Sequence, residues 1–345
     1  MSFALFTAAT VFAAPPKVPA QAADPAALAD GTTLLAPIQV QSLTLTPIVA
    51  TAAPKDADDL LVLDEAMAAK QVKIQEIADG SVNNLTFINQ AAHPVFVMAG
   101  EVIIGGKQDR IIGRNTVIPA NTTQSVPVFC VEHGRWDGTT KEFTTAKALA
   151  HGRLRGQASY AAQQDVWNEV AAKNKVRKTE TASGTYRQVA QQQSDGTLSA
   201  MQHQVDAALA KLPAADRARM VGYAVALNGN VATVDLFGSP TLFKKLETKL
   251  VHSYLTEAVD IAAQKDIAPP TPAAVKQFMA DVDKAAEKDS YDTAAADTKV
   301  TSGEHASKAR VEYKRGPRPN AANAANPAAA APPAPATVYQ NYQAN

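Results

Sequence analysis

The sequence predicts an α+β fold, with an antiparallel β-sandwich or barrel-like sheet in the N-terminal half and helices with a β-hairpin in the C-terminal half. Up to Trp136, short apolar runs alternate with closely spaced turn signals, which favours antiparallel sheets over βαβ units. Beyond Trp136, apolar residues recur every three or four positions, which is the period of an amphipathic helix. An Asn-Gly pair between two apolar runs at Asn228-Gly229 predicts a late hairpin.

The N-terminal half is expected to consist mainly of short strands. Residues 38–50 alternate between apolar and polar side chains, and residues 60–77 read as a strand, a short helix and a second strand. The segments 83–100 and 115–133 each contain two β-rich runs separated by turn residues, Pro119 to Asn121 in the second case.

The C-terminal half is expected to contain amphipathic helices on either side of the hairpin. Pro213 ends one of these helices and Pro240 opens the next. Because a lone hairpin is only marginally stable, we expect it to join a sheet shared with the earlier strands. The apolar faces of the helices are Val166, Trp167, Val170 and Ala171; Leu198 to Leu212; Leu242 to Leu255; and Val275, Phe278, Met279 and Val282.

Three segments are predicted along the chain. Residues 1–36 read as a signal peptide followed by an Ala/Pro-rich linker, because an apolar stretch of signal-peptide length is followed by small-residue cleavage sites. This predicts an exported, periplasmic or extracellular protein; a disordered arm on a cytoplasmic protein is the alternative. Residues 37–288 form a single α+β domain. Residues 289–345 are expected to be a disordered Ala/Pro/Asn-rich tail, with Tyr339 and Tyr342 as an alternative docking stub for a protein partner.

Composition excludes several functional classes. Lysine plus arginine equals aspartate plus glutamate, 33 each, so no basic excess points to a nucleic-acid partner. The single cysteine, Cys130, excludes an intramolecular disulfide. No apolar run reaches the roughly 18 residues of a transmembrane helix. The six histidines show no metal-ligand spacing, and the common hydrolase and nucleotide-binding motifs are missing, so the sequence predicts no metal site and names no cofactor.

The first candidate cluster surrounds two adjacent glycines, Gly105 and Gly106, within an apolar run. It contains Glu101, Lys107, Gln108, Asp109 and Arg110. Glycines let a backbone approach a ligand closely, and a lysine with an arginine beside them is typical of a phosphate or carboxylate site. The alternative is a tight turn with a solvated charged face, or a buried ion pair.

The second candidate cluster is the segment from Cys130 to Trp136. Cys130 and Glu132 point to one face of a strand and His133 to the other, so Cys130 is interpreted as a small core residue rather than a nucleophile. Arg135 and Trp136 end the strand, where an arginine and an indole together suit a planar or anionic ligand. A guanidinium stacked structurally on the indole is the alternative.

Four blocks, in order, resemble one bacterial and archaeal family: AGEVIIGGKQDRII, VIPANTTQSVPVFCVEHGRW, QQDVWNEV and VGYAVALNGNVATVDLFGSPTLFKKLETKLVHSYLTEA. The family is the domain named for its association with ADP-ribosylglycohydrolases and rhodanese-phosphatases, and its role is not established. The resemblance spans about Ile38 to Ala258. The shared positions are Gly100, Glu101, Gly105, Lys107, Gln108, Arg110, Pro119, Cys130, Glu132, Gly134, Arg135, Trp136, Trp167, Asp235, Phe237, Ser239 and Pro240.

The resemblance implies that the charged run is a family signature, and the family name points to ligands related to NAD or ADP-ribose. The family often has acids where this chain has Ala99 and Val102, so of three carboxylates only Glu101 is present, which argues against catalysis.

Three functions remain open. The first is binding of a small anionic ligand, a nucleotide or ADP-ribose-like molecule, by Glu101, Lys107, Gln108, Arg110, Glu132, Arg135 and Trp136. The second is a non-enzymatic exported envelope protein, in which Glu101, Lys107, Arg110 and Glu132 form a buried ionic network. The third is a hydrolase using Glu101 and Asp235 as acid and base.

Overall fold

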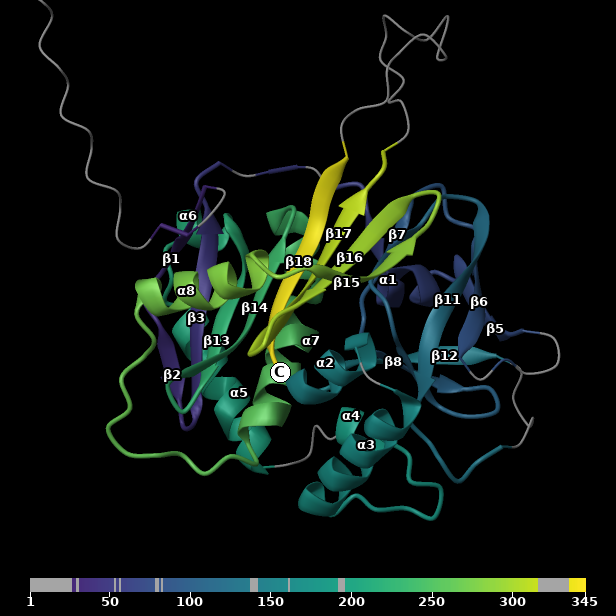
Figure 1. Ribbon diagram of the computed structural model, residues 1–345, viewed down its shortest axis with the longest axis horizontal. Coiled ribbons are helices and arrows are strands. Elements are labelled where there is room, and N and C mark those ends of the chain that lie inside the picture. Colours follow the sequence, from purple (N-terminus) through teal and green to yellow (C-terminus); the bar gives the residue numbers. More distant parts are fainter. Residues whose placement is uncertain are drawn as a thin grey trace, which may run out of the picture.

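The computed structural model describes residues 27–28, 31–52, 54–55, 57–77, 81, 83–136, 142–160, 162–191, 196–315 and 335–345. Within these ranges the chain forms three sheets and a set of helices, as Figure 1 shows. The helices are α1 (Leu63–Ala68), α2 (Gly152–Tyr160), α3 (Gln163–Arg177), α4 (Arg187–Ala190), α5 (Gly196–Leu209), α6 (Ala214–Arg217), α7 (Pro240–Ala258) and α8 (Pro272–Asp283). None of the helices in the described ranges has both the length and the apolar character needed to span a membrane.

The N-terminal half forms a curled, half-barrel sheet with strand order β12-β8-β9-β11-β6-β5. A bridge between Gln75 and Glu142 joins the two edges of this sheet, β5 and β12, so the sheet curls around its own core. Apolar side chains such as Phe87, Ile103 and Phe143 fill that core. The strands are β5 (Val72–Glu76), β6 (Asn84–Asn89), β8 (Glu101–Gly105), β9 (Arg110–Ile112), β11 (Thr122–Cys130) and β12 (Phe143–Leu149).

Three short strands cover this sheet, in the order β10 (Thr116–Ile118), β7 (Val95–Val97) and β4 (Leu61–Val62). β4 runs parallel to β7 and leads directly into α1, so the predicted strand, helix, strand order of residues 60–77 is confirmed. Helices α2, α3 and α4 pack on the outside of β8, β9, β11 and β12, around Leu154, Val166 and Tyr186.

The largest sheet has nine strands in the order β1-β3-β13-β14-β18-β17-β16-β15, with β2 beside β3. Helices α5 and α7 cover one face, and α8 covers the other, as Figure 1 shows. This double cover explains why every residue of β3 is buried. The strands are β1 (Thr32–Leu34), β2 (Ile38–Val40), β3 (Leu43–Ala50), β13 (Met220–Leu227), β14 (Asn230–Phe237), β15 (Glu287–Asp292), β16 (Ala296–Ser302), β17 (Ala306–Tyr313) and β18 (Ala336–Ala344).

The predicted α+β class and the predicted hairpin are confirmed. Asn228 and Gly229 both have positive φ, 46° and 81°, as a two-residue turn between β13 and β14 requires. β13 also pairs with β3, so the hairpin does join strands from the N-terminal part of the chain. Ser239 caps α7 through its hydroxyl, which accepts a hydrogen bond from Leu242 N at 3.1 Å.

The prediction that residues 289–345 are disordered is wrong for the described parts of this segment, which form β15 to β18. β18 pairs with β14 and β17 in the middle of the sheet, and Tyr339 and Tyr342 are buried there rather than presented to a partner. In β16 and β17 the buried positions alternate, but Ala296, Thr298, Ser307 and Ala309 are small, so no strong period of two is visible in the sequence. Residues 316–334 lie outside the described residues, as do residues 1–26 and 29–30 of the predicted signal-peptide and linker segment, residues 1–36; β1 falls inside that segment.

We predict that Gly222→Ala destabilises the protein by about 3 kcal/mol or more. Gly222 lies in β13, and a Cβ built there would overlap the carbonyl oxygen of Asp235 on β14. Urea unfolding followed by circular dichroism measures the change. Gly196→Ala is the control, because nothing lies within 4 Å of a Cβ at the start of α5. Equal stability of the two variants would contradict the close approach of β13 to β14.

Candidate functional site

A groove lies where β8, β12, α4 and the segment after β11 meet, with a volume of about 730 Å³. We call it the arginine groove, because Arg135 and Arg187 line it. Its other lining residues are Ile104, Gly105, Glu132, Glu142, Phe143, Thr144, Ser183, Thr185 and Gln188. Gly105 of the first candidate cluster and Glu132 and Arg135 of the second line the groove together, so the structure brings these two segments together.

Asp109 lies behind the arginine groove and positions Arg187. Its carboxylate is fully buried and receives two hydrogen bonds from Arg187, from Nε at 3.0 Å and from Nη2 at 2.7 Å. The hydroxyl of Thr185 and the backbone N–H of Gly105 donate to it at 2.7 and 3.0 Å. A two-pronged, charge-assisted pair of this kind fixes the plane of the guanidinium group. Arg187 is therefore held in place before any ligand arrives.

Glu132 holds the second arginine. Its Oε2 lies 2.9 Å from Arg135 Nε and accepts a hydrogen bond from Asp109 N at 3.0 Å. Burial alone would raise the pKa of Glu132, but the hydrogen bonds from Arg135, Asp109 N and Ser183 lower it, so the carboxylate stays ionised. Arg135 also donates to the carbonyl of Gly106 at 2.8 Å.

The two glycines serve packing rather than ligand approach. Gly105 and Gly106 have φ of +123° and +52°, which side chains rarely adopt. A Cβ on Gly105 would overlap the carbonyl of Glu142, and one on Gly106 would overlap the ring of Phe143. The glycines are thus required where the sheet curls and β12 approaches β8.

Gln108 and Arg110 lie behind the arginine groove and do not reach it. Gln108 Nε2 donates to the carbonyl of Glu132 at 2.8 Å, which ties the charged run to the end of β11. Arg110 is fully buried; its Nη1 donates to Gln108 O at 2.8 Å, and its Nη2 lies 4.0 Å from Glu76. A ligand in the groove would not contact either side chain.

Lys107 and Trp136 lie together beside the groove. The ammonium group of Lys107 lies 4.9 Å from the centre of the Trp136 ring, a cation–π distance. The Trp136 side chain is 51% exposed, which makes it one of two large exposed apolar side chains in the described part of the chain. Arg135 is the expected partner of this indole, but Arg135 pairs with Asp109 and Glu132, and Lys107 lies over the ring instead.

Glu101 belongs to a different cluster, under α7. It is buried and ion-paired with Lys249, which also lies 3.0 Å from Asp64. Burial raises the pKa of Glu101, and nearby Asp64 adds to this shift, although the ammonium group of Lys249 opposes it. Burial alone would lower the pKa of Lys249, but the carboxylates of Glu101 and Asp64 raise it. The predicted network partners of Glu101, namely Lys107 and Arg110, are therefore wrong.

Asp235 forms a third cluster, in the nine-stranded sheet. Its buried carboxylate accepts hydrogen bonds from the hydroxyls of Tyr254 and Tyr339, and Arg155 Nη2 lies 3.0 Å away. Glu101 is paired with Lys249 and Asp235 with Arg155, in separate clusters, so the geometry gives an acid–base pair no support. No group of three or more potential metal ligands occurs among those residues either.

Sequence reasoning missed the residues that complete each cluster: Arg187, Lys249 and Arg155. Lys249 carries a signal that we did not use, because it lies three residues after Leu246 on the apolar face of α7, where a lysine needs a buried acid. Arg187 and Arg155 lie on helices with no distinctive local pattern, and only the tertiary fold brings them to Asp109 and Asp235.

Cys130 is a buried core residue, as predicted. Its side chain is inaccessible, and burial raises the pKa of the thiol to about 11, with nearby Arg110 opposing that shift. A thiol with this pKa is a poor nucleophile at neutral pH.

We predict that Lys249→Met lowers the free energy of unfolding by roughly 3–5 kcal/mol, because it leaves the buried Glu101 without a counter-charge. Adding Glu101→Gln should recover part of this loss. Chemical denaturation of both variants tests the expectation. Lys299→Met is the control, since Lys299 is 53% exposed, lies 3.5 Å from Glu287 and should matter by less than about 0.5 kcal/mol. A double variant no more stable than Lys249→Met would contradict the ion pair.

We also predict a pH dependence from Cys130. Because the folded-state pKa is raised, the thiol contributes stability that is fully present below pH 9.0 and is lost as the pH rises towards about 11. A pKa difference of one pH unit corresponds to about 1.4 kcal/mol, so the free energy of unfolding of the wild type should fall by about 2 to 3 kcal/mol more than that of Cys130→Ala over this range. Urea unfolding at several pH values gives both curves, and parallel curves would contradict the shift.

Comparison with known sequences supports the resemblance noted above. Residues 31–318 match the sequence profile of the ARG and Rhodanese-Phosphatase-superfamily-associated Protein domain, ARPP-1. No curated protein and no solved structure matches the chain. The match covers α1 to α8 and every described strand except β18, which lies beyond its end. The chain therefore belongs to the ARPP-1 domain family, whose role is not established.

Proposed function

We propose that the protein binds a small anionic ligand, a nucleotide or an ADP-ribose-like molecule, in the arginine groove. The proposal rests on a difference in burial between the paired acidic and basic side chains of the groove. The two carboxylates that pair with the arginines are buried, with Asp109 0% and Glu132 5% exposed, whereas Arg135 is 20% and Arg187 40% exposed. An approaching ligand therefore meets these two guanidinium groups rather than their paired carboxylates, and the exposed Glu142 is the one other acidic side chain among the described lining residues.

Arg187 is the main contact in this proposal. Its Nε and Nη2 are used by Asp109, and its Nη1 has no hydrogen-bond partner among the described residues. A fixed guanidinium with a free donor offers an anion a directed hydrogen bond without a further loss of side-chain entropy. Arg135 already contacts Glu132, Asp109 and the carbonyl of Gly106, so we expect it to attract the ligand by its charge rather than by a direct hydrogen bond.

Trp136 and Lys107 supply the second part of the proposed site. An exposed indole with a cation on one face retains the other face for a planar group, such as a nucleobase. Lys107 adds a positive charge at the same point. The family name, which associates this domain with ADP-ribosylglycohydrolases, agrees with a ligand that combines a base with a diphosphate.

We expect Arg187→Gln to weaken binding of ADP-ribose or pyrophosphate by at least about tenfold, which corresponds to about 1.4 kcal/mol. Isothermal titration calorimetry with ADP-ribose, NAD, pyrophosphate and phosphate measures this. Affinity should fall with added salt, because exposed guanidinium groups are screened.

Arg217→Gln is the matched control, because Arg217 makes a similar two-pronged pair with Glu247 and is 38% exposed, far from the groove. If Arg187→Gln unfolds, Arg187→Lys keeps a charge on Asp109 and removes the two-pronged geometry. Failure of every anion to bind the wild type, or an equal loss in the Arg217 variant, would overturn the proposal.

A further inference from the structure

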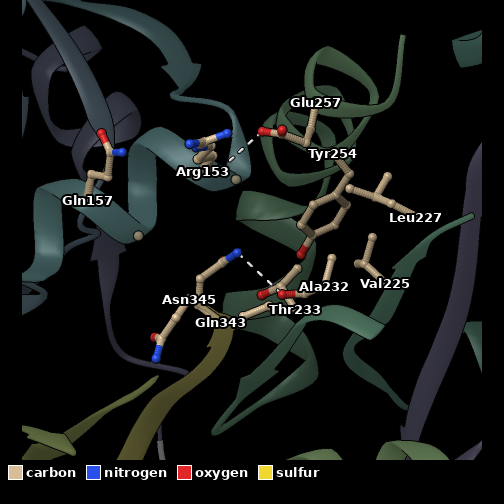
Figure 2. A pocket seen from close by; sticks show the side chains of 13 residues that line it. Arg153, Gln157, Val225, Leu227, Ala232, Thr233, Tyr254, Glu257, Gln343 and Asn345 are labelled. Carbon is tan, nitrogen blue, oxygen red and sulfur yellow. Dashed lines mark hydrogen bonds between the residues drawn. The ribbon is translucent and has the colours of Figure 1, made fainter. Parts of the chain in front are cut away.

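A cavity of about 490 Å³ lies between α2, α7 and the nine-stranded sheet. It shares no lining residue with the arginine groove. We call it the α2–α7 cavity. Figure 2 shows the Tyr254 ring and the Glu257 carboxylate of α7 on one side, with Arg153 and Gln157 of α2 across from them. Apolar side chains of β13, Val225 and Leu227, form its floor. The volume lies in the usual range for a small-molecule site.

Glu257 is the unusual residue of this cavity. It is half-buried, and among the described residues no lysine, arginine or histidine forms an ion pair with it. The one hydrogen bond to its carboxylate comes from the backbone N–H of Arg153, at 3.1 Å. A carboxylate partly removed from water without a cation is costly, unless a cation arrives from outside.

The neighbouring acids show the contrast. Glu169 lies 3.1 Å from Arg153, and Asp260 lies 2.7 Å from Lys173. The buried Asp235 has Arg155. The guanidinium of Arg153 is 70% exposed and lies beside Glu169, so it does not neutralise Glu257.

The walls around Glu257 suit an apolar group. Tyr254 presents its ring to the cavity while its hydroxyl donates to the buried Asp235, so the ring is held in one orientation. On the opposite wall, Gln343 Nε2 donates to Ala232 O at 3.3 Å and the Thr233 hydroxyl donates to Tyr342 O at 2.8 Å. The buried Oε1 atoms of Gln343 and Gln157 have no hydrogen-bond partner among the described residues, so they remain as acceptors for an N–H group. A carboxylate above apolar and aromatic surface is the arrangement that recognises an organic cation.

We propose that the α2–α7 cavity binds a small organic amine, whose ammonium group pairs with Glu257 and whose alkyl chain packs on Val225, Leu227 and the ring of Tyr254. This site has the opposite charge preference from the arginine groove and does not depend on it. No bond is made or broken in this binding.

The test compares three probes of one shape: 3-methylbutylamine, 3-methyl-1-butanol and 3-methylbutanoate. Titration calorimetry with the full chain should show binding of the amine, with the alcohol and the carboxylate at least tenfold weaker. Glu257→Gln should weaken amine binding at least tenfold, while it keeps an oxygen for the N–H of Arg153 and so leaves the fold intact. Glu304→Gln is the control, because the Glu304 side chain is 87% exposed.

A second variant blocks the cavity without removing charge. A Cβ at Gly152 would lie 3.8 Å from Glu257 Oε2 and 3.9 Å from Gln343 Nε2, which is ordinary van der Waals contact. Gly152→Ala should therefore fold normally and still weaken amine binding, since the methyl group lies in front of the carboxylate. Equal binding of the carboxylate probe, unchanged affinity in Glu257→Gln, or no binding of the amine at millimolar concentration would each overturn the proposal.

Discussion

The buried carboxylate of Asp235 constrains the arrangement of four elements. An ionised group removed from water needs hydrogen-bond donors on all sides, and Asp235 on β14 receives them from α2, α7 and β18. Burial alone would lower the pKa of Arg155, but Asp235 raises it, so this pair stays charged. Tyr339 and Asn341 can reach Asp235 only if β18 lies next to β14. The position of β18 in the middle of the sheet therefore follows from this charge as well as from its backbone pairing.

Helix α7 connects the Asp235 cluster to the half-barrel sheet. Tyr254 fixes the rotation of the helix against β14, and Lys249, just over one turn earlier, then points at Glu101 on β8 and at Asp64 on α1. The two sheets are thus joined by α7, whose buried face is mainly apolar and includes the polar contacts of Tyr254 and Lys249. Such contacts add less stability than an apolar pair would, but they penalise any other rotation of the helix, so they select one packing arrangement.

The sequence alone predicted the elements whose local pattern is strong. The α+β class, the Asn228-Gly229 hairpin and the helix opened by Pro240 depend on turn chemistry and on the 3.6-residue period, and both are local properties. In β16 and β17, small residues such as Ala296, Thr298 and Ala309 occupy buried alternate positions, so the period of two is weak and these strands were missed. The strands β15 to β18 are stabilised by pairing with one another and, through β18, with β14, which is distant in the chain.

The candidate sites illustrate a different limit. A net charge of zero gives no basic excess that points to a nucleic-acid partner, but it says nothing of local charge, which burial sorts by depth. In the arginine groove Asp109 is buried and its partner Arg187 is 40% exposed, so a ligand can reach the cation of this pair but not the anion. In the α2–α7 cavity Glu257 is left without a cation while its neighbours are paired. The charge that a ligand meets is set by which partner of each pair remains in water, and only the tertiary structure decides that.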